Sequence, residues 1–290
     1  MEATMNFAHL RCGRGFERGP GARACRMRMP SQAGLSLVEI LVALAIGLFL
    51  VLIATTIYMQ GLSSFGFRVG QSENLGNSRL ALAVLDSEFS KAGYRRDPSQ
   101  AMFDAFPADS SPHPNGCQFA QGQALYAADA QTICLRFQPR DAAETDCAGT
   151  PANLGAAGPY DAPAPATGMF AEKYTVESGV LVCRAAQEVV PLADGVRAVH
   201  FEFGIDRQTA PGAIRRVDAF TATLPGTQEA IRSLRLALLL ESSGKVTQGM
   251  TSTVCERWAQ LGGARARCDA NAGSLLQLAT GTLTLRNLMP

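Results

Sequence analysis

Residues 33–59, AGLSLVEILVALAIGLFLVLIATTIYM, form an apolar stretch of membrane-spanning length. Residues 40–59 are a run of twenty positions without a charge, and the next charged residue is Arg68. A helix of that length matches a hydrocarbon core about 30 Å thick. One carboxylate, Glu39, lies close to the start of the run. The sequence therefore predicts a membrane-spanning helix that carries a single carboxylate near one end.

The charges around this helix predict its orientation. Residues 1–34 contain six arginines against Glu2 and Glu17, whereas the rest of the chain has 20 basic and 23 acidic residues. Because basic flanks stay in the cytoplasm, everything after the helix is expected to be exported. A secretory signal peptide shares the basic flank, but its apolar region is shorter and a cleavage site of the A-x-A type follows it. The sequence QGLSSFGFRVG after Met59 is unconvincing as such a site, so we favour a retained span.

Cysteine usage agrees with export. Cys12 and Cys25 precede the span, and six cysteines follow it without any C-x-x-C pair, which is the usual spacing of zinc or redox sites. Three disulfides are the simplest expectation in an oxidising compartment, and buried free thiols are the alternative. Nearest neighbours in sequence give the pairs Cys117–Cys134, Cys147–Cys183 and Cys255–Cys268. The last pair closes a loop of about fourteen residues, worth roughly 3 kcal/mol.

The helix is expected to continue beyond the membrane. No proline occurs between Pro30 and Pro98, and Gly93 is a natural stop. One face is predicted to carry Leu75, Ser78, Leu82, Leu85, Phe89 and Ala92. A single helix over residues 35–92 would be about 87 Å long. Its first part, 35–59, would lie in lipid, and its amphipathic part, 60–93, would pack on an exported head.

Residues 94–290 are predicted to form that head as one domain rich in β-strands. The segment 98–165 holds nine prolines and is expected to be mostly loops, with short strands at QALYAA and TICLRF. The segments MFAEKYTV and GVLVCRA flank Glu177-Ser178-Gly179 as a hairpin would. Further strands are expected in VRAVHFEFGI, AIRSLRLALLLES and LATGTLTLRN. The fold class is therefore α+β, a long apolar helix followed by a sheet-rich head.

Several function classes find no support in the sequence. The exported part has no basic patch interleaved with aromatic residues, so nucleic acid is not an expected partner. His113 and His200 are its only histidines, and the nucleophile-elbow, zinc-protease, phosphate-loop and EF-hand motifs are missing from the sequence. We therefore expect no enzyme, no cofactor and no metal. An adhesive module built on the proline-rich segment 98–165 is a weaker alternative.

The run Gly34-Leu35-Ser36-Leu37-Val38-Glu39 resembles the type IV prepilin signature. In that family a prepilin peptidase cuts after the glycine and methylates the new N-terminus. The resemblance implies that residues 1–34 are a leader, that cleavage follows Gly34, and that Leu35 becomes N-methylated. The first mature residue in the family is usually Phe, and here it is Leu.

Three later segments resemble minor pilins of the PilW type: LDSEFSKAGYRR (85–96), LADGVRAVHFEFGID (192–206) and SLRLALLLESSGKV (233–246). This resemblance implies a subunit that helps to initiate or cap type IV pili, which serve in cell adhesion and twitching motility. Its implied partners are prepilin peptidase, other minor pilins, the major pilin, a possible tip adhesin and the inner membrane. The J-type pseudopilins of type II secretion share the same plan and are the main alternative.

Two roles are open for Glu39. It is a tolerated charge near the membrane interface, or it pairs with the α-amino group of a neighbouring subunit inside a helix bundle. A charge at the bilayer centre costs roughly 2.5–3.5 kcal/mol. Glu39 lies short of the centre, so the membrane can tolerate its charge without a partner. Cleavage after Gly34 would create the cation that the second reading requires.

Overall fold

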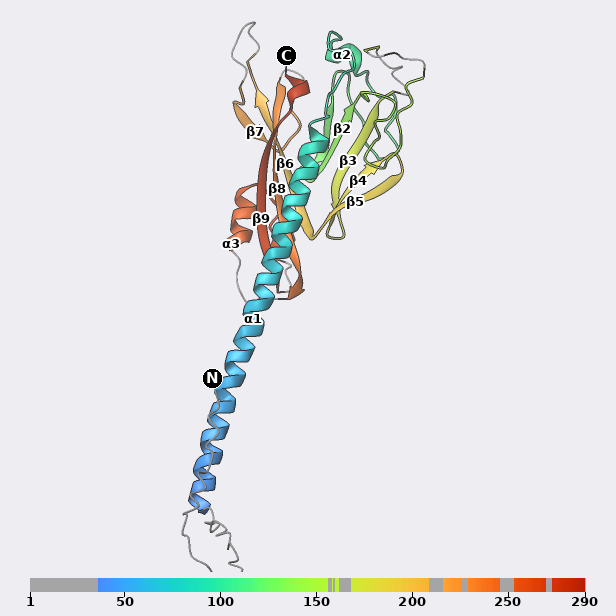
Figure 1. Cartoon of the computed structure of the whole chain (residues 1–290). Coiled ribbons are helices and arrows are strands. Elements are labelled where there is room, and N and C mark those ends of the chain that lie inside the picture. Colours follow the sequence, from blue (N-terminus) through green and yellow to red (C-terminus); the bar gives the residue numbers. More distant parts are fainter. Residues whose placement is uncertain are drawn as a thin grey trace, which may run out of the picture. The chain divides into compact units, whose positions relative to one another are not determined.

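The computed structural model describes residues 36–155, 158, 160–161, 168–208, 216–225, 229–245, 253–269 and 273–289. The chain divides into two compact units, Met1–Thr55 and Thr56–Pro290. Nearly all described residues of the first unit belong to helix α1, and their side chains are exposed. The second unit contains the rest of α1 and two antiparallel sheets (Figure 1). The predicted plan, a long apolar helix followed by a sheet-rich head, is confirmed.

Helix α1, Leu37–Phe89, is continuous through all of its glycines. It ends three residues before the predicted Ala92, because the chain tightens into a turn in which the Ala92 amide donates to the Phe89 carbonyl at 3.1 Å. Gly93 follows with a φ of +70°, which suits glycine at the end of a helix. The side-chain amide of Asn287 donates to the Ser90 carbonyl at 2.8 Å and so satisfies one free acceptor of this turn.

The first sheet is a five-stranded meander in the order β1-β2-β3-β4-β5. Its strands are β1 Leu125–Asp129, β2 Thr132–Phe137, β3 Phe170–Glu177, β4 Val180–Ala185 and β5 Glu188–Asp194. The predicted hairpin of β3 and β4 is present, and Ser178 and Gly179 form its turn with positive φ angles of 50° and 82°. Two consecutive positive φ angles match the twist of a tight hairpin.

The second sheet has the order β7-β6-β8-β9. Its strands are β6 Val196–Asp206, β7 Ala219–Thr221, β8 Ala230–Lys245 and β9 Ser274–Thr284. Short helices complete the described chain: α2 Met102–Ala105, α3 Thr253–Gln260, α4 Ala266–Asp269 and the 3₁₀ turn Arg286–Leu288. Trp258 of α3 is fully buried against the second sheet, together with the Cys255–Cys268 disulfide.

The last turns of α1 join the two sheets in one apolar core. Phe89 packs edge-on against Tyr174 of β3 at 5.1 Å between ring centroids, and against Phe201 of β6 at 5.9 Å. Leu85 and Ala81, one and two turns earlier, are fully buried in the same cluster. Burial of apolar area at this junction is the main stabilising term, at about 25 cal/mol per Å².

The buried face of α1 differs from the predicted one. It consists of Gly70, Asn74, Ser78, Ala81, Leu85 and Phe89. Leu75 was expected on this face, but it is 41% exposed. The helix is turned toward its small and polar residues because Gly70 lets the backbone approach β8: a Cβ at that position would lie only 3.1 Å from the Cβ of Ser242.

A buried arginine organises the proline-rich segment after α1. The guanidinium of Arg136 on β2 donates to the carbonyl oxygens of Pro107 at 2.7 Å and Ala120 at 2.9 Å, and lies 3.4 Å from the Asp109 carboxylate. Its charged end also lies between two aromatic rings, those of Phe106 and Phe119. Desolvation lowers the pKa of Arg136 to about 10, and Asp109 opposes that shift, so the side chain stays charged at neutral pH.

Candidate functional site

The candidate functional site is the start of helix α1, where apolar side chains have no cover within the described chain. Every side chain from Ser36 to Phe65 is exposed, and Leu37, for example, is 74% exposed. The helix is long and apolar enough to cross a membrane, by length and composition. A continuous exposed surface of this kind requires lipid or other protein to cover it. The site is therefore an association surface rather than a pocket.

Glu39 lies in the first turn of α1. The helix begins directly after Ser36, whose carbonyl accepts the Ile40 amide at 3.2 Å. Serine is a favoured residue before the first helical turn, and an acidic side chain there is stabilised by the helix dipole. Among the residues that the structure describes, Glu39 has no ion-pair partner. The Glu39 side chain is exposed within the part of the chain that the structure describes.

The other predicted positions fall into two groups. Gly34 and Leu35, with Cys12 and Cys25, lie outside the described residues. The six later cysteines form the disulfides Cys117–Cys134, Cys147–Cys183 and Cys255–Cys268, which are the nearest-neighbour pairs. Cys147, Cys183 and Glu172 also lie close together as a metal site would require. Because the two sulfur atoms are bonded to each other, they offer no thiolate to a metal ion.

A polar latch, defined here as Glu73 and Asn74 of α1 with Ser243 and Leu275, fixes the helix to the second sheet. The Asn74 side-chain amide donates to the Leu275 carbonyl at 2.8 Å. The Glu73 carboxylate accepts the Ser243 hydroxyl at 3.0 Å and its backbone amide at 3.2 Å. Sequence reasoning missed this latch, although Gly70, Asn74 and Ser78 repeat every four residues, which is the spacing of one helical face.

The two histidines of the head serve local packing. His113 lies 3.2 Å from the Asp109 carboxylate in the segment that Arg136 organises. His200 is buried on β6, and its Nε2 would lie only 2.6 Å from a Cβ at Gly262, so the imidazole leaves no room for a side chain there. Burial lowers the pKa of His200, with a smaller contribution from Arg235, and Glu202 opposes the shift. The imidazole is therefore neutral at pH 7 and packs edge-on against Trp258.

One comparison with known proteins matches the start of helix α1. Residues 29–55 match the family model of the prokaryotic N-terminal methylation motif, which is the type IV prepilin signature. No curated protein is significantly similar to this chain in sequence. Among solved structures, a type IV-like pilin from Thermus thermophilus is similar, with 16% identity over 74% of this chain and 97% of that chain, and a TM-score of 0.34.

Proposed function

We propose that this protein is a minor pilin of the PilW type, which helps to initiate or cap type IV pili. The observation that carries the proposal is the methylation motif at residues 29–55, which leads directly into an uncovered apolar helix. Cleavage at this motif would create a new N-terminus at the start of the apolar helix, where it can be buried when subunits assemble. The PilW subtype rests on the segments 85–96, 192–206 and 233–246.

Assembly in this proposal begins with cleavage. Prepilin peptidase cuts after Gly34, and the new α-amino group on Leu35 is methylated. Glu39 of one subunit then pairs with the α-amino group of a neighbour when the apolar helices align side by side. In an environment without water such an ion pair has a strong Coulomb attraction. Loss of one partner leaves the other charge buried and unpaired, which costs the assembly about 3–5 kcal/mol. The same apolar surface is covered by lipid before assembly and by other helices after it.

The head supports this role through its connection to the helix. In the second unit, the polar latch and the packing of Phe89 fix residues 73–89 to both sheets. A head fixed in this way is carried with its helix when the subunit leaves the membrane. The three disulfides suit a head that folds and works in an oxidising compartment.

A J-type pseudopilin has the same processing motif, so the two roles are separated by phenotype. The gene is deleted in its native cell, and surface pili and type II secreted proteins are both quantified. The proposal expects few pili and normal secretion, both restored by the wild-type gene. Normal pili with blocked secretion assigns the protein to the secretion apparatus. Normal pili and normal secretion with loss of surface binding assigns it to the adhesive class, and either of these last two results overturns the proposal.

A further inference from the structure

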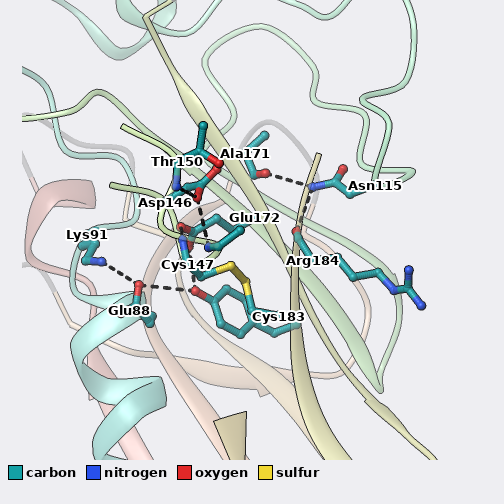
Figure 2. The surroundings of a disulfide bond; sticks show 12 residues. Glu88, Lys91, Asn115, Asp146, Cys147, Thr150, Ala171, Glu172, Cys183 and Arg184 are labelled. Atoms are coloured by element: carbon teal, nitrogen blue, oxygen red, sulfur yellow. Dashed lines mark hydrogen bonds and ion pairs between the residues drawn. A yellow bond between two sulfur atoms is a disulfide. The ribbon is translucent and has the colours of Figure 1, made fainter. Parts of the chain in front are cut away.

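A chain of polar side chains links the end of α1 to the first sheet, next to the Cys147–Cys183 disulfide (Figure 2). Glu172 on β3 is fully buried, and its carboxylate accepts the Cys147 backbone amide at 2.8 Å and the Tyr174 hydroxyl at 2.6 Å. The same hydroxyl lies 3.4 Å from the carboxylate of Glu88 in the last turn of α1. Lys91 donates to that Glu88 oxygen at 2.6 Å.

Tyr174 has one hydroxyl hydrogen and two carboxyl neighbours, so it can donate to only one of them. When Glu172 is ionised, the hydrogen goes to Glu172, and the Tyr174 oxygen faces Glu88 without a hydrogen between them. When Glu172 is protonated, its own O–H donates to the Tyr174 oxygen, and Tyr174 is free to donate to Glu88. The proton on Glu172 therefore decides whether the end of α1 is hydrogen-bonded to β3.

The surroundings of Glu172 favour a proton on it near neutral pH. Its cross-strand neighbours are Leu135 on β2 and Ala185 on β4, neither of which is polar. The covering loop contributes Cys147, which is bonded to Cys183, and Asp146, whose carboxylate accepts amides of its own loop.

The charged groups that face this carboxyl come from the end of α1. Desolvation is the largest effect and raises the pKa of Glu172 to about 7; the negative charge of Glu88 adds to it. The hydrogen bonds from Tyr174 and Cys147 and the charge of Lys91 act in the opposite direction. Protonation and ionisation are thus both accessible under mild conditions.

We propose that Tyr174 is a proton-operated switch, which ties the last turn of α1 to β3 when Glu172 is protonated and releases it when Glu172 is ionised. The step moves one proton between solvent and the Glu172 carboxylate and turns one hydroxyl, with no covalent change elsewhere. The switch sits where Phe89 joins the helix to both sheets, so mildly acidic surroundings tighten the attachment of the head to its helix.

The test is amide hydrogen exchange of the full chain in detergent micelles, measured about 1.5 pH units below and above 7 and corrected for intrinsic exchange rates. The reporters are residues 86–92, where the amides of Ser90, Lys91 and Ala92 donate within the turn. We expect their protection to fall about tenfold from the acidic to the alkaline sample. Residues 74–80 of α1, which the polar latch fixes to the second sheet, are the internal control and should not change.

Two variants fix the switch in opposite positions. Glu172→Gln keeps an oxygen for the Cys147 amide and offers an N–H to Tyr174, so protection should stay high at both pH values. Tyr174→Phe keeps the ring that packs on Phe89 but removes the hydroxyl, so protection should stay low at both. The proposal is overturned if the wild-type protein shows no fall, or if Glu172→Gln shows the same fall as wild type. A Tyr174→Phe variant that retains the full pH response also overturns it.

Discussion

The side-chain amide of Asn74 donates a hydrogen bond of 2.8 Å to the carbonyl oxygen of Leu275, 201 positions later in the chain. Asn74 is fully buried, and Leu275 lies on β9, an edge strand of the second sheet. A buried polar group of this kind is costly unless it is paired, so the contact selects one position of the helix on the sheet. Helix and head are thereby joined by a specific bond as well as by apolar packing.

Removal of this bond should weaken the head. Asn74→Ala leaves the Leu275 carbonyl without its donor, and we expect the free energy of unfolding to fall by about 1–3 kcal/mol. Thermal unfolding of the full chain in detergent micelles, followed by circular dichroism, measures the change. Gln71→Ala is the matched control, because Gln71 is an exposed amide one turn earlier. Equal midpoints for the two variants would contradict the role of the latch.

Arg136 should determine the order of the segment that precedes β1. Arg136→Met removes the donor to the carbonyls of Pro107 and Ala120 and leaves Asp109 with His113 as its only basic neighbour among the described residues. We expect a loss of about 3–5 kcal/mol, typical of a broken buried pair, and rapid proteolysis within residues 106–123. Limited proteolysis with mass mapping measures this. Arg140→Met is the control, since the Arg140 side chain is 72% exposed, and cleavage that is equally fast in both variants would refute the assignment.

The stability of the head should depend on pH through Glu172. Its folded pKa of about 7 lies above the ordinary 4.5, so the folded state binds the proton more tightly than the unfolded state. The stabilisation is complete below pH 4.5 and is lost as pH rises toward 7, and its size is at most on the order of 3 kcal/mol. His200 acts in the opposite direction, because its lowered pKa destabilises the folded state as pH falls below 6.5.

The comparison of wild type with Glu172→Gln isolates the carboxyl from the histidine. Unfolding free energies are measured from pH 4.5 to pH 8 in both proteins. The difference between them should change across the interval between 4.5 and 7 and stay constant above it. A difference that is independent of pH would show that Glu172 titrates normally and is not buried as described.

Much of this fold was accessible from the sequence because its signals are local. The apolar run of α1, the missing prolines, the alternation in β6 and β9 and the apolar stretch of β8 predict elements without reference to distant residues. The cysteine pairs are also local, because each disulfide joins a cysteine to the next one in sequence, 13 to 36 residues away. These are the features that periodicity and spacing can detect.

The remaining features depend on pairs that the sequence does not connect. The buried face of α1 is not predictable from apolar periodicity, which favours Leu75 over Gly70 and Asn74. Gly70 is needed because β8 comes close to the helix backbone, and Asn74 because its amide donates to a carbonyl of β9. In the sequence, Arg136 is indistinguishable from an exposed polar residue of a strand. Its burial depends on the loop before β1, whose carbonyl oxygens accept its hydrogen bonds. Glu172 is likewise buried because the Cys147–Cys183 disulfide holds the loop around Cys147 over its carboxylate.

Glu39 should be required for assembly and not for processing. Glu39→Ala removes the carboxylate that would pair with a neighbour's α-amino group, so cleavage after Gly34 should be normal while recovery in sheared pili falls. Thr55→Ala is the control in the same helix, because the Thr55 hydroxyl already bonds to the Leu52 carbonyl of its own chain. Normal recovery of Glu39→Ala would refute the pairing, unless the subunit is located at the pilus tip, where one neighbour is missing.

The most direct test of the central claim is the mass and N-terminal sequence of this protein in sheared surface filaments. We predict a chain that begins at Leu35, carries one methyl group on its α-amino nitrogen, and retains the apolar residues up to Met59. A chain that keeps residues 1–34, or that is cleaved beyond Met59 as a secretory signal would be, contradicts it. So does a protein that is processed at Gly34 but never leaves the membrane fraction in cells that make normal filaments.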